Sequence, residues 1–270
     1  MVRTGFIGSV ALVIVLGSLS ACTKNDSKVE VCEPTGLLDI SFFENCVFVC
    51  IDIQPGQRAY MTVESMPKSW VEAGMKPEDL NAATDQKFDA AYPNARKVTE
   101  ACRSIKMPMI FVHWGHKFKD GMDLEPDIRE FMTATFGPDS NSWPNHISSP
   151  DARPADFLGV REGEYVISKT AHDAFASSNI GYILQNLGIE NIVFIGGHTD
   201  ACLGKTSISA KEHGYKTLCV EDATFAGLMS LWRQGLEQSK YDYIVTTKEF
   251  LNLVSLAADS DTVDSTAKRE

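Results

Sequence analysis

The amino-acid sequence predicts a single three-layer α/β/α domain built on a parallel sheet of about six strands. Two observations support this fold class. Short apolar runs alternate with segments whose apolar residues recur at helical spacing. Strands that alternate with helices form a parallel sheet covered on both faces by right-handed crossovers. The length of 270 residues suits one sizeable domain and is too short for two.

The first predicted strand-helix-strand unit lies between residues 47 and 112. Val47–Ile51 is a continuous apolar run, which is typical of a strand buried on both faces. Apolar residues within 95–105 have helical spacing and follow Pro93, a residue that suits a first helical turn. Met109–Val112 is the next predicted strand.

The next unit joins two strands through a short helix. Tyr165–Ile167 predicts the third strand. Four apolar residues within 180–187 follow at positions i, i+3, i+4 and i+7, and Gly188 is placed to end that helix. Ile192–Ile195 is the fourth predicted strand.

The last part of the domain repeats the alternation. A glycine turn leads into a helix that opens at Cys202 and ends at Gly214. The strand Thr217–Val220 follows, and a helix is predicted near Leu228–Leu236. The final strand is Tyr243–Thr246.

Two long loops and a terminal segment lie outside these elements. The loops, at about 54–92 and 115–163, leave the edge of the sheet at which the strands end. Loops of this length at such an edge often act as lids or specificity elements. One domain is expected over residues 41–257, and the polar residues 258–270 are expected to form a frayed tail.

The first 21 residues are predicted to be a signal peptide. Arg3 precedes an apolar run, ending near Leu19, that is too short for a permanent membrane span. Leu19-Ser20-Ala21-Cys22 resembles a bacterial lipobox, which implies cleavage before Cys22 and diacylglycerol on its sulfur. Several acyl chains would give stable anchoring, with 22–40 as lipidated N-terminus and polar tether. We expect a cell-envelope protein on the outer membrane, facing the periplasm; the alternative is an ordinary secretory signal with an incidental cysteine.

Charge and cysteine content restrict the partners. The net charge of −11 argues against nucleic acid and against adhesion to anionic headgroups, so the membrane contact is expected through the lipid only. Disulfides are permitted outside the cytoplasm, and Cys32 and Cys46 flank the entry to the first strand. Whether these two pair is left open. No Cys-x-x-Cys spacing suggests a zinc or redox site.

Three chemically reactive side chains lie at predicted strand ends. Asp52 follows the first strand, Lys169 the third, and Cys202 opens the helix after the fourth. We expect them to converge, because such sheets bind ligands beyond the carboxyl ends of their strands. A thiol in the first turn of a helix faces unpaired N–H groups and the positive end of the helix dipole, which favours the thiolate. Asp52 would take the thiol proton, and Lys169 would hold both anions.

Three motifs carry a resemblance to a known family: Phe48-Val-Cys-Ile-Asp-Ile-Gln54, Val166-Ile-Ser-Lys169 with Ala174-Phe175 after it, and Gly196-Gly-His-Thr-Asp-Ala-Cys202. With them, residues 45–250 resemble the isochorismatase-like cysteine hydrolases, which include nicotinamidases, N-carbamoylsarcosine amidases and ureidoacrylate amidohydrolases. The resemblance implies a Rossmann-like fold and a catalytic triad of Asp52, Lys169 and Cys202. It also implies a cis peptide before His198, with the amides of His198 and Cys202 forming the oxyanion hole.

Departures from the family pattern narrow the expected chemistry. Members that hydrolyse isochorismate lack the nucleophilic cysteine, so Cys202 points to cleavage of a C–N bond. The Asp-x-His element of the nicotinamidase metal site is missing, and we expect no metal and no cofactor. His113 and His116 are the one close histidine pair; a polar lining of the pocket is expected of them, while a metal role stays open. Gln54, Trp114 and Phe175 are the other candidate pocket residues.

The leading hypothesis is a cofactor-free hydrolase that acts on a small amide, ureido or carbamoyl compound through an acyl-enzyme. One alternative is a catalytically inactive lipoprotein of the same fold that binds a small molecule or an envelope protein. An oxidising compartment, which is awkward for a catalytic thiol, favours that alternative. Another is a metal-assisted, nicotinamidase-type deamidase. The resemblance further implies a homo-oligomer.

Overall fold

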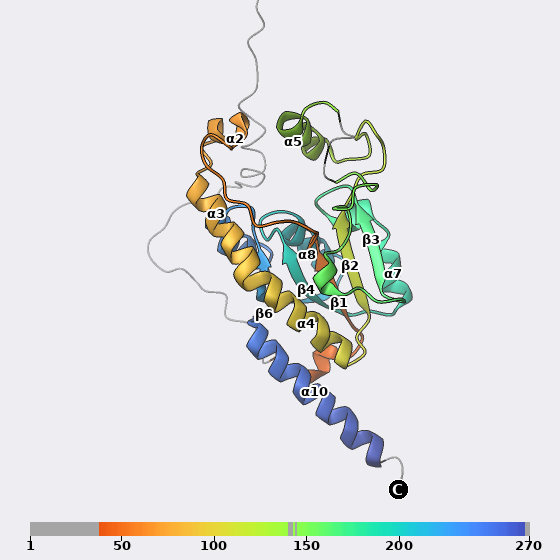
Figure 1. The fold of residues 1–270 in the computed structure, drawn as a ribbon. Coiled ribbons are helices and arrows are strands. Elements are labelled where there is room, and N and C mark those ends of the chain that lie inside the picture. The colour runs from red at the N-terminus through yellow and green to blue at the C-terminus, as the bar shows by residue number, and fades with distance from the viewer. Residues whose placement is uncertain (1–37, 140–142, 144, 268–270) are drawn as a thin grey trace, which may run out of the picture.

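A parallel β-sheet forms the centre of the protein (Figure 1). The computed structural model describes residues 38–139, 143 and 145–267. Within them, six parallel strands form one sheet in the order β3-β2-β1-β4-β5-β6. They are β1 (Cys46–Ile51), β2 (Met109–Trp114), β3 (Tyr165–Lys169), β4 (Asn191–Gly197), β5 (Lys216–Phe225) and β6 (Tyr243–Val245). The predicted fold class is confirmed, and each predicted strand is present.

The strand order creates a crevice between β1 and β4. From β1 the chain moves outward to β2 and β3, returns to the other side of β1 as β4, and continues outward through β5 and β6. Open α/β sheets bind ligands beyond the carboxyl ends of the strands at such a reversal. Asp52 and the turn at 198–201 directly follow β1 and β4, so both lie at this crevice.

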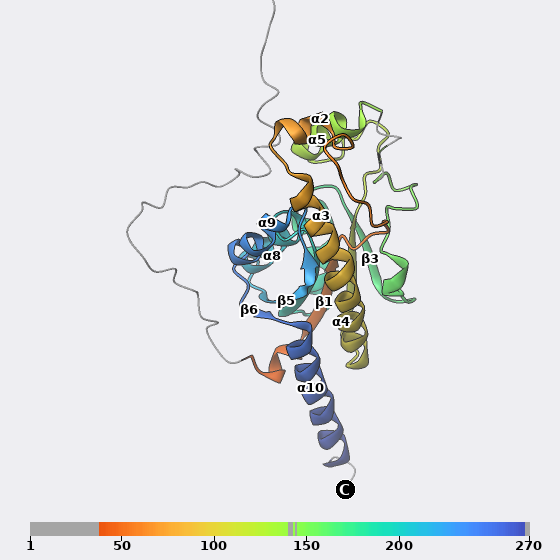
Figure 2. The same cartoon turned by 60° about the vertical axis from the view of Figure 1, so that its left-hand side comes forward.

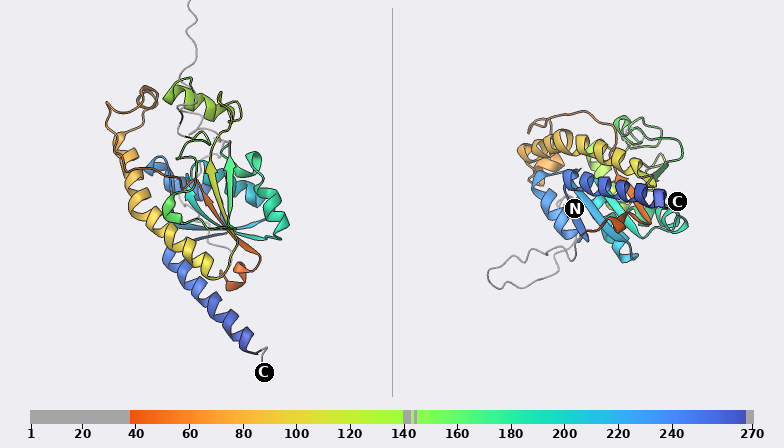
Figure 3. Two further views of the ribbon diagram at one scale, coloured as in Figure 1. Left: turned by 45° about the vertical axis from the view of Figure 1, so that its right-hand side comes forward. Right: turned by 90° about the horizontal axis from the view of Figure 1, so that it is seen from below.

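Helices cover both faces of the sheet. The main ones are α4 (Tyr92–Ser104), α6 (Ala174–Ser177), α7 (Ile180–Asn186), α8 (Cys202–Glu212), α9 (Met229–Gln238) and α10 (Thr247–Ala267). Alternate residues of β1 face opposite layers: Phe48 packs in the core with α4 and α10, and Val49 packs in the core with α7 and α8. Figures 2 and 3 show α10 lying beside α4. The molecule therefore has three layers.

Both long connections contain helices where the sequence analysis expected loops. The first forms α2 (Lys68–Glu72), α3 (Pro77–Asp85) and the π-helix η2 (Gln86–Ala91), which continues into α4 as one rod (Figure 3). The second forms α5 (Pro126–Phe136) and the 3-10 helix η4 (Asp156–Leu158). Signals for α3 were present, namely a proline in its first turn and two acidic residues beside it. Figure 1 shows α2 and α5 above the carboxyl ends of the strands.

The last helix extends into the segment 258–270, which was expected to be a polar tail. Helix α10 continues to Ala267. Its first half is anchored in the core by Phe250 and Val254. In addition, no glycine or proline interrupts the helix.

The predictions for the N-terminus fall outside the described residues. These are the signal peptide at 1–21, the lipidation site Cys22, nearly all of the tether at 22–40, and Cys32 as a partner for Cys46. The described chain begins just before the 3-10 helix η1 (Ile40–Phe43), which precedes β1. In the described segments, no helix is long and apolar enough to cross a membrane.

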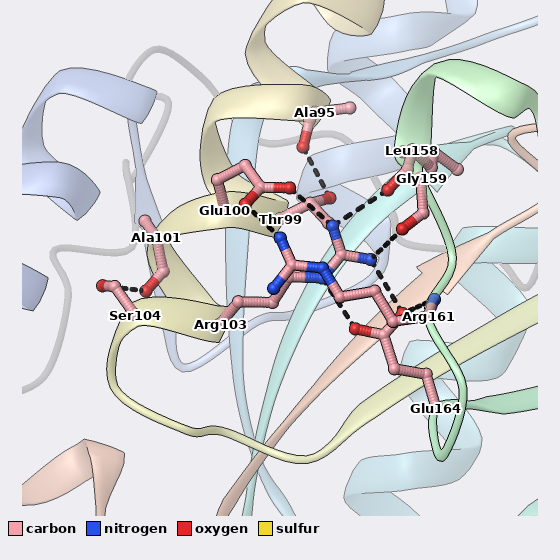
Figure 4. Close-up of polar contacts among 10 residues, drawn as sticks. All are labelled: Ala95, Thr99, Glu100, Ala101, Arg103, Ser104, Leu158, Gly159, Arg161 and Glu164. Carbon is pink, nitrogen blue, oxygen red and sulfur yellow. Dashed lines mark hydrogen bonds and ion pairs between the residues drawn. The ribbon is translucent and has the colours of Figure 1, made fainter.

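A buried arginine fixes the strand that carries Lys169. Arg103, on α4, forms a two-pronged ion pair with Glu164, at 2.6 Å from Nε to Oε1 and 2.7 Å from Nη2 to Oε2 (Figure 4). It also donates to the carbonyl oxygens of Leu158 and Gly159, each at 3.0 Å. Because Glu164 directly precedes β3, this network ties the start of that strand to α4.

Candidate active site

The structure brings together the three side chains that the sequence placed at strand ends. Nζ of Lys169 lies 2.9 Å from Oδ2 of Asp52. Cys202 is close enough to both for their charges to act on the pKa of its thiol. A carboxylate, an ammonium and a thiol thus meet at the crevice between β1 and β4.

Asp52 is aimed into the crevice by its backbone. It has a φ of +52°, in the left-handed region that aspartate tolerates better than most residues. Its N–H donates to the carbonyl of Val112 at 2.9 Å, which fixes the turn against β2. One carboxylate oxygen is paired with Lys169, and the other, Oδ1, has no hydrogen-bond partner among the described residues. Asp52 therefore keeps a free acceptor beside the thiol.

Lys169 is fully buried at the end of β3. Its ammonium contacts Asp52 and donates to the carbonyl of Ala171 at 3.2 Å. Burial by itself would lower the pKa of Lys169, but the negative charges of Asp52 and of a Cys202 thiolate outweigh it and raise that pKa. The side chain is therefore a permanent cation.

Cys202 is the first residue of α8 and reaches the cavity surface. Burial raises the pKa of its thiol to about 12, although Lys169 pulls that pKa down. Loss of hydration thus opposes the thiolate, which the helix N-terminus and the neighbouring ammonium favour. A base must therefore remove the proton as the sulfur attacks.

His172 is a neighbour of the thiol that the sequence analysis did not assign to the site. Its Nδ1 lies 3.4 Å from Sγ of Cys202. The backbone N–H of His172 donates to Oε2 of Glu125 at 3.0 Å, which holds the turn after β3 in place. Burial lowers the pKa of His172 to about 4, and the ring is therefore neutral near pH 7. Its position three residues after Lys169 was the available signal.

The turn before Cys202 is tightly packed. The peptide bond between Gly197 and His198 is cis, as the family resemblance implied. Gly196 has a φ of +105°, and a Cβ there would lie 2.0 Å from the carbonyl oxygen of Ile51. Only glycine allows β4 to run this close to β1. Within the described residues, no backbone hydrogen bond uses the N–H of His198 or of Cys202, so both can serve a ligand.

A cavity of about 490 Å³ opens above these residues. Asp52, His172, His198 and Cys202 form its polar floor. Gln54 and Trp114, two of the predicted pocket residues, line it as well. The amide of Gln54 also pins the end of β2, since its Oε1 accepts from the N–H of Trp114 at 2.8 Å.

Three predicted pocket residues do not line this cavity, and that expectation is corrected. His113 is buried on β2, where burial lowers its pKa. His116 is fully buried and packs against the rings of Trp143 and His146. Phe175, in helix α6, stacks on His213, with ring centroids 4.8 Å apart. Because side chains alternate along a strand, His113 does not share the cavity-facing side of its neighbour Trp114.

The described residues contain no group of three or more His, Cys, Asp or Glu side chains arranged to hold a metal ion. His113 and His116 therefore have no third side-chain ligand of these types among them. The chemistry available at the floor of the cavity is that of a nucleophile and a base, with the buried ammonium of Lys169 beside the base.

Comparison with known proteins gives a consistent result. The model of the isochorismatase domain matches residues 46–249. Ureidoacrylate amidohydrolase RutB of Agrobacterium fabrum is 23% identical over 229 residues, covering 77% of this chain and 94% of the relative. The uncharacterized isochorismatase family protein YwoC of Bacillus subtilis is 26% identical over 170 residues, covering 60% and 82%.

Solved structures share the fold. A cysteine hydrolase from Pseudomonas syringae pv. phaseolicola superposes with a TM-score of 0.60 at 15% identity, covering 86% of this chain and 100% of that one. N-carbamoylsarcosine amidase from Thermoplasma acidophilum gives 0.52 at 22% identity, covering 75% and 96%.

Proposed function

The chain belongs to the isochorismatase family, and from this premise we propose that it is a cysteine hydrolase that cleaves a C–N bond of an amide, ureido or carbamoyl compound. One observation carries the proposal: the Cys202 thiol faces a cavity beside a buried Asp52–Lys169 pair. The amidohydrolase names of several relatives support the same class of reaction.

The first half-reaction forms an acyl-enzyme. Asp52 accepts the thiol proton through its free oxygen as Sγ of Cys202 bonds to the carbonyl carbon. A concerted transfer suits a thiol that is neutral at rest. The carbonyl becomes a tetrahedral oxyanion, for which the N–H groups of His198 and Cys202 are the available donors. Lys169 holds the carboxylate in place and offsets negative charge on the sulfur.

The first half-reaction ends as Asp52 returns its proton to the nitrogen of the substrate, the C–N bond breaks, and ammonia or an amine leaves behind the thioester acyl-enzyme. The second half-reaction releases the acid. A water molecule then attacks the thioester while Asp52 takes one of its protons. Collapse of that intermediate breaks the C–S bond, the proton passes to sulfur, and the free thiol is restored.

Ammonia release from a panel of small amides and ureides tests the proposal. Cys202→Ala should reduce kcat by at least about 10³-fold while the circular dichroism spectrum stays unchanged. Cys219→Ala is the matched control, because it removes a buried thiol of β5 and should retain activity. Full activity of the Cys202→Ala protein would exclude the mechanism.

The cellular location of the protein is the subject of a separate proposal, which rests on the N-terminal sequence. We propose that the chain is lipid-anchored through Cys22 on the periplasmic side of the outer membrane. Cells grown with labelled palmitate should label the wild-type protein and not Cys22→Ala. Equal labelling of both proteins would contradict the anchor.

A further inference from the structure

Apolar side chains form most of the cavity wall above Cys202. They come from elements that the two long connections and α9 place over the sheet, as Figure 1 shows for α2 and α5. From α2, α3 and the segment between them come Trp70, Leu80 and Met75; from α5 come Ile128, Phe131, Met132 and Phe136; from α9 and its N-cap come Leu231 and Leu228. The wall is therefore suited to an apolar group.

Two aromatic side chains of this wall stack on each other. The rings of Trp70 and Phe131 are stacked, with centroids 6.1 Å apart and an angle of 14° between their planes. Trp70 belongs to the first long connection and Phe131 to the second. The cavity wall thus joins side chains from two separate segments of the chain.

The charges around the cavity disfavour an anion. Among the described residues that line it, Asp52, Asp151 and Asp200 are carboxylates, and none is lysine or arginine. The ammonium of Lys169 is already paired with Asp52. Two further lysines lie near the cavity, and neither lines it. Burial lowers the pKa of Lys87 to about 8 against the opposing effect of Asp52, and its Nζ lies 4.8 Å from the ring centroid of Phe225. The charge of Lys205 acts on the pKa of His172.

From this wall and this charge pattern we infer that the substrate is an uncharged carboxamide whose acyl part carries a large apolar group, aromatic or alkyl. The inference rests on the proposed function for the reacting amide. A carboxylate on the substrate would lose its hydration without gaining a counterion. An apolar group gains from leaving water, and each added methylene in such a pocket typically changes the rate by about 10-fold or more.

Three amides with the same reacting group separate the possibilities. They are 3-phenylpropanamide, butanamide, and succinamate, in which a carboxylate takes the place of the phenyl ring. We expect kcat/KM for 3-phenylpropanamide to exceed that for butanamide by at least about 10-fold, and that for succinamate by at least about 100-fold. Equal or faster hydrolysis of succinamate would overturn the substrate class and leave the hydrolase proposal intact.

Binding to the Cys202→Ala protein, measured by calorimetry, tests the wall without turnover. 3-Phenylpropanamide should bind at least about 10-fold more tightly than succinamate. If that order holds and the wild-type protein releases no ammonia from any amide, the proposed function fails while the inference about the cavity stands. Equal binding, or tighter binding of succinamate, would overturn the inference.

Two variants locate the preference in the wall. Leu231→Arg places a cation in the cavity. It should raise kcat/KM for succinamate relative to kcat/KM for 3-phenylpropanamide by at least about 10-fold. Ile208→Arg is the control, because Ile208 lies on the exposed side of α8 outside the cavity and should leave the ratio unchanged. Phe136→Ala, at a half-exposed position, should lower kcat/KM for 3-phenylpropanamide more than for butanamide. Unchanged ratios in both Leu231→Arg and Phe136→Ala would contradict the assignment.

Discussion

Nζ of Lys169 lies 2.9 Å from Oδ2 of Asp52, and the lysine side chain has no exposed surface. This ion pair joins the end of β3 to the end of β1 across β2, so it ties these strands together and also holds the carboxylate in place. Removal of one partner leaves the other charge buried without compensation, which is a large penalty.

Lys169→Met should therefore lower the free energy of unfolding by about 3 kcal/mol, as measured by urea denaturation. The folded-state pKa of Lys169 is raised, so the stabilisation is complete below 10.5 and is lost as pH rises through the raised value. The effect should be constant between pH 6 and 9. Lys211→Met removes a pair that is one-third exposed on both sides, and should cost less than about 1 kcal/mol. Equal losses in the two variants would contradict the buried pair.

Alkylation of Cys202 should be slow at neutral pH. With a thiol pKa of about 12, the thiolate fraction at pH 7 is far below that of a free cysteine. The rate of reaction with iodoacetamide should rise steadily up to pH 9 and should not level off near pH 7. Mass spectrometry of wild type and Cys202→Ala identifies the modified residue, since the other described cysteines are buried. A plateau near neutral pH would show a resting thiolate.

His172 should make the protein sensitive to acid. Burial lowers its pKa from the ordinary 6.5 to about 4 in the folded state, so between these values the unfolded chain binds more protons. Stability should therefore fall as the pH is lowered from 6.5 to 4. In His172→Gln, which cannot titrate, the decline in Tm over this range should be smaller. An identical decline in Tm in both proteins would show that protonation of His172 does not contribute to the loss of stability in acid.

The Arg103–Glu164 pair should stabilise the folded protein more than an ion pair on the surface does. The side chains are 5% and 10% exposed, so Arg103→Met strands a buried carboxylate and should cost about 3–5 kcal/mol. Arg161→Met is the matched control, because Arg161 and Glu100 are 58% and 52% exposed and should contribute less than about 1 kcal/mol. Urea denaturation of the two variants measures how much unfolding free energy each one loses.

The same pair gives a pH signature. Burial tends to raise the pKa of Glu164, and its bonds to Arg103 more than offset this, so the net shift is downward from 4.5. Its stabilisation is present above that value and is lost as pH falls through the lowered pKa. The gap in stability between wild type and Arg103→Met should consequently narrow below pH 4.5. A constant gap down to pH 3 would speak against the ion pair.

Much of the fold could be predicted from local pattern. The run at Val47–Ile51 has to be a central strand, because a segment that is apolar at every position must be buried on both faces. The reactive residues were found for a related reason: Asp52, Lys169 and Cys202 interrupt or follow such runs, where a polar side chain has no packing role. Helix α3 was missed because its start signals lie in a segment that was read as a loop.

The pocket could not be predicted in the same way. His113, His116 and Phe175 stand beside site residues in sequence, yet they face the core or a neighbouring ring cluster. His172 and Phe131 lie far from Cys202 along the chain, and only folding places one at the sulfur and the other in the cavity wall.

The sequence by itself determined the order of strands and helices and the three reactive groups at the strand ends, because both depend on residues that are neighbours in the chain. The tertiary structure alone decided that the thiol of Cys202 is buried, which raises its pKa, and that the wall of its cavity is largely apolar, with no lysine or arginine among the described lining residues. Burial and local charge are sums over atoms from distant segments, and their balance exists only once those segments have packed together.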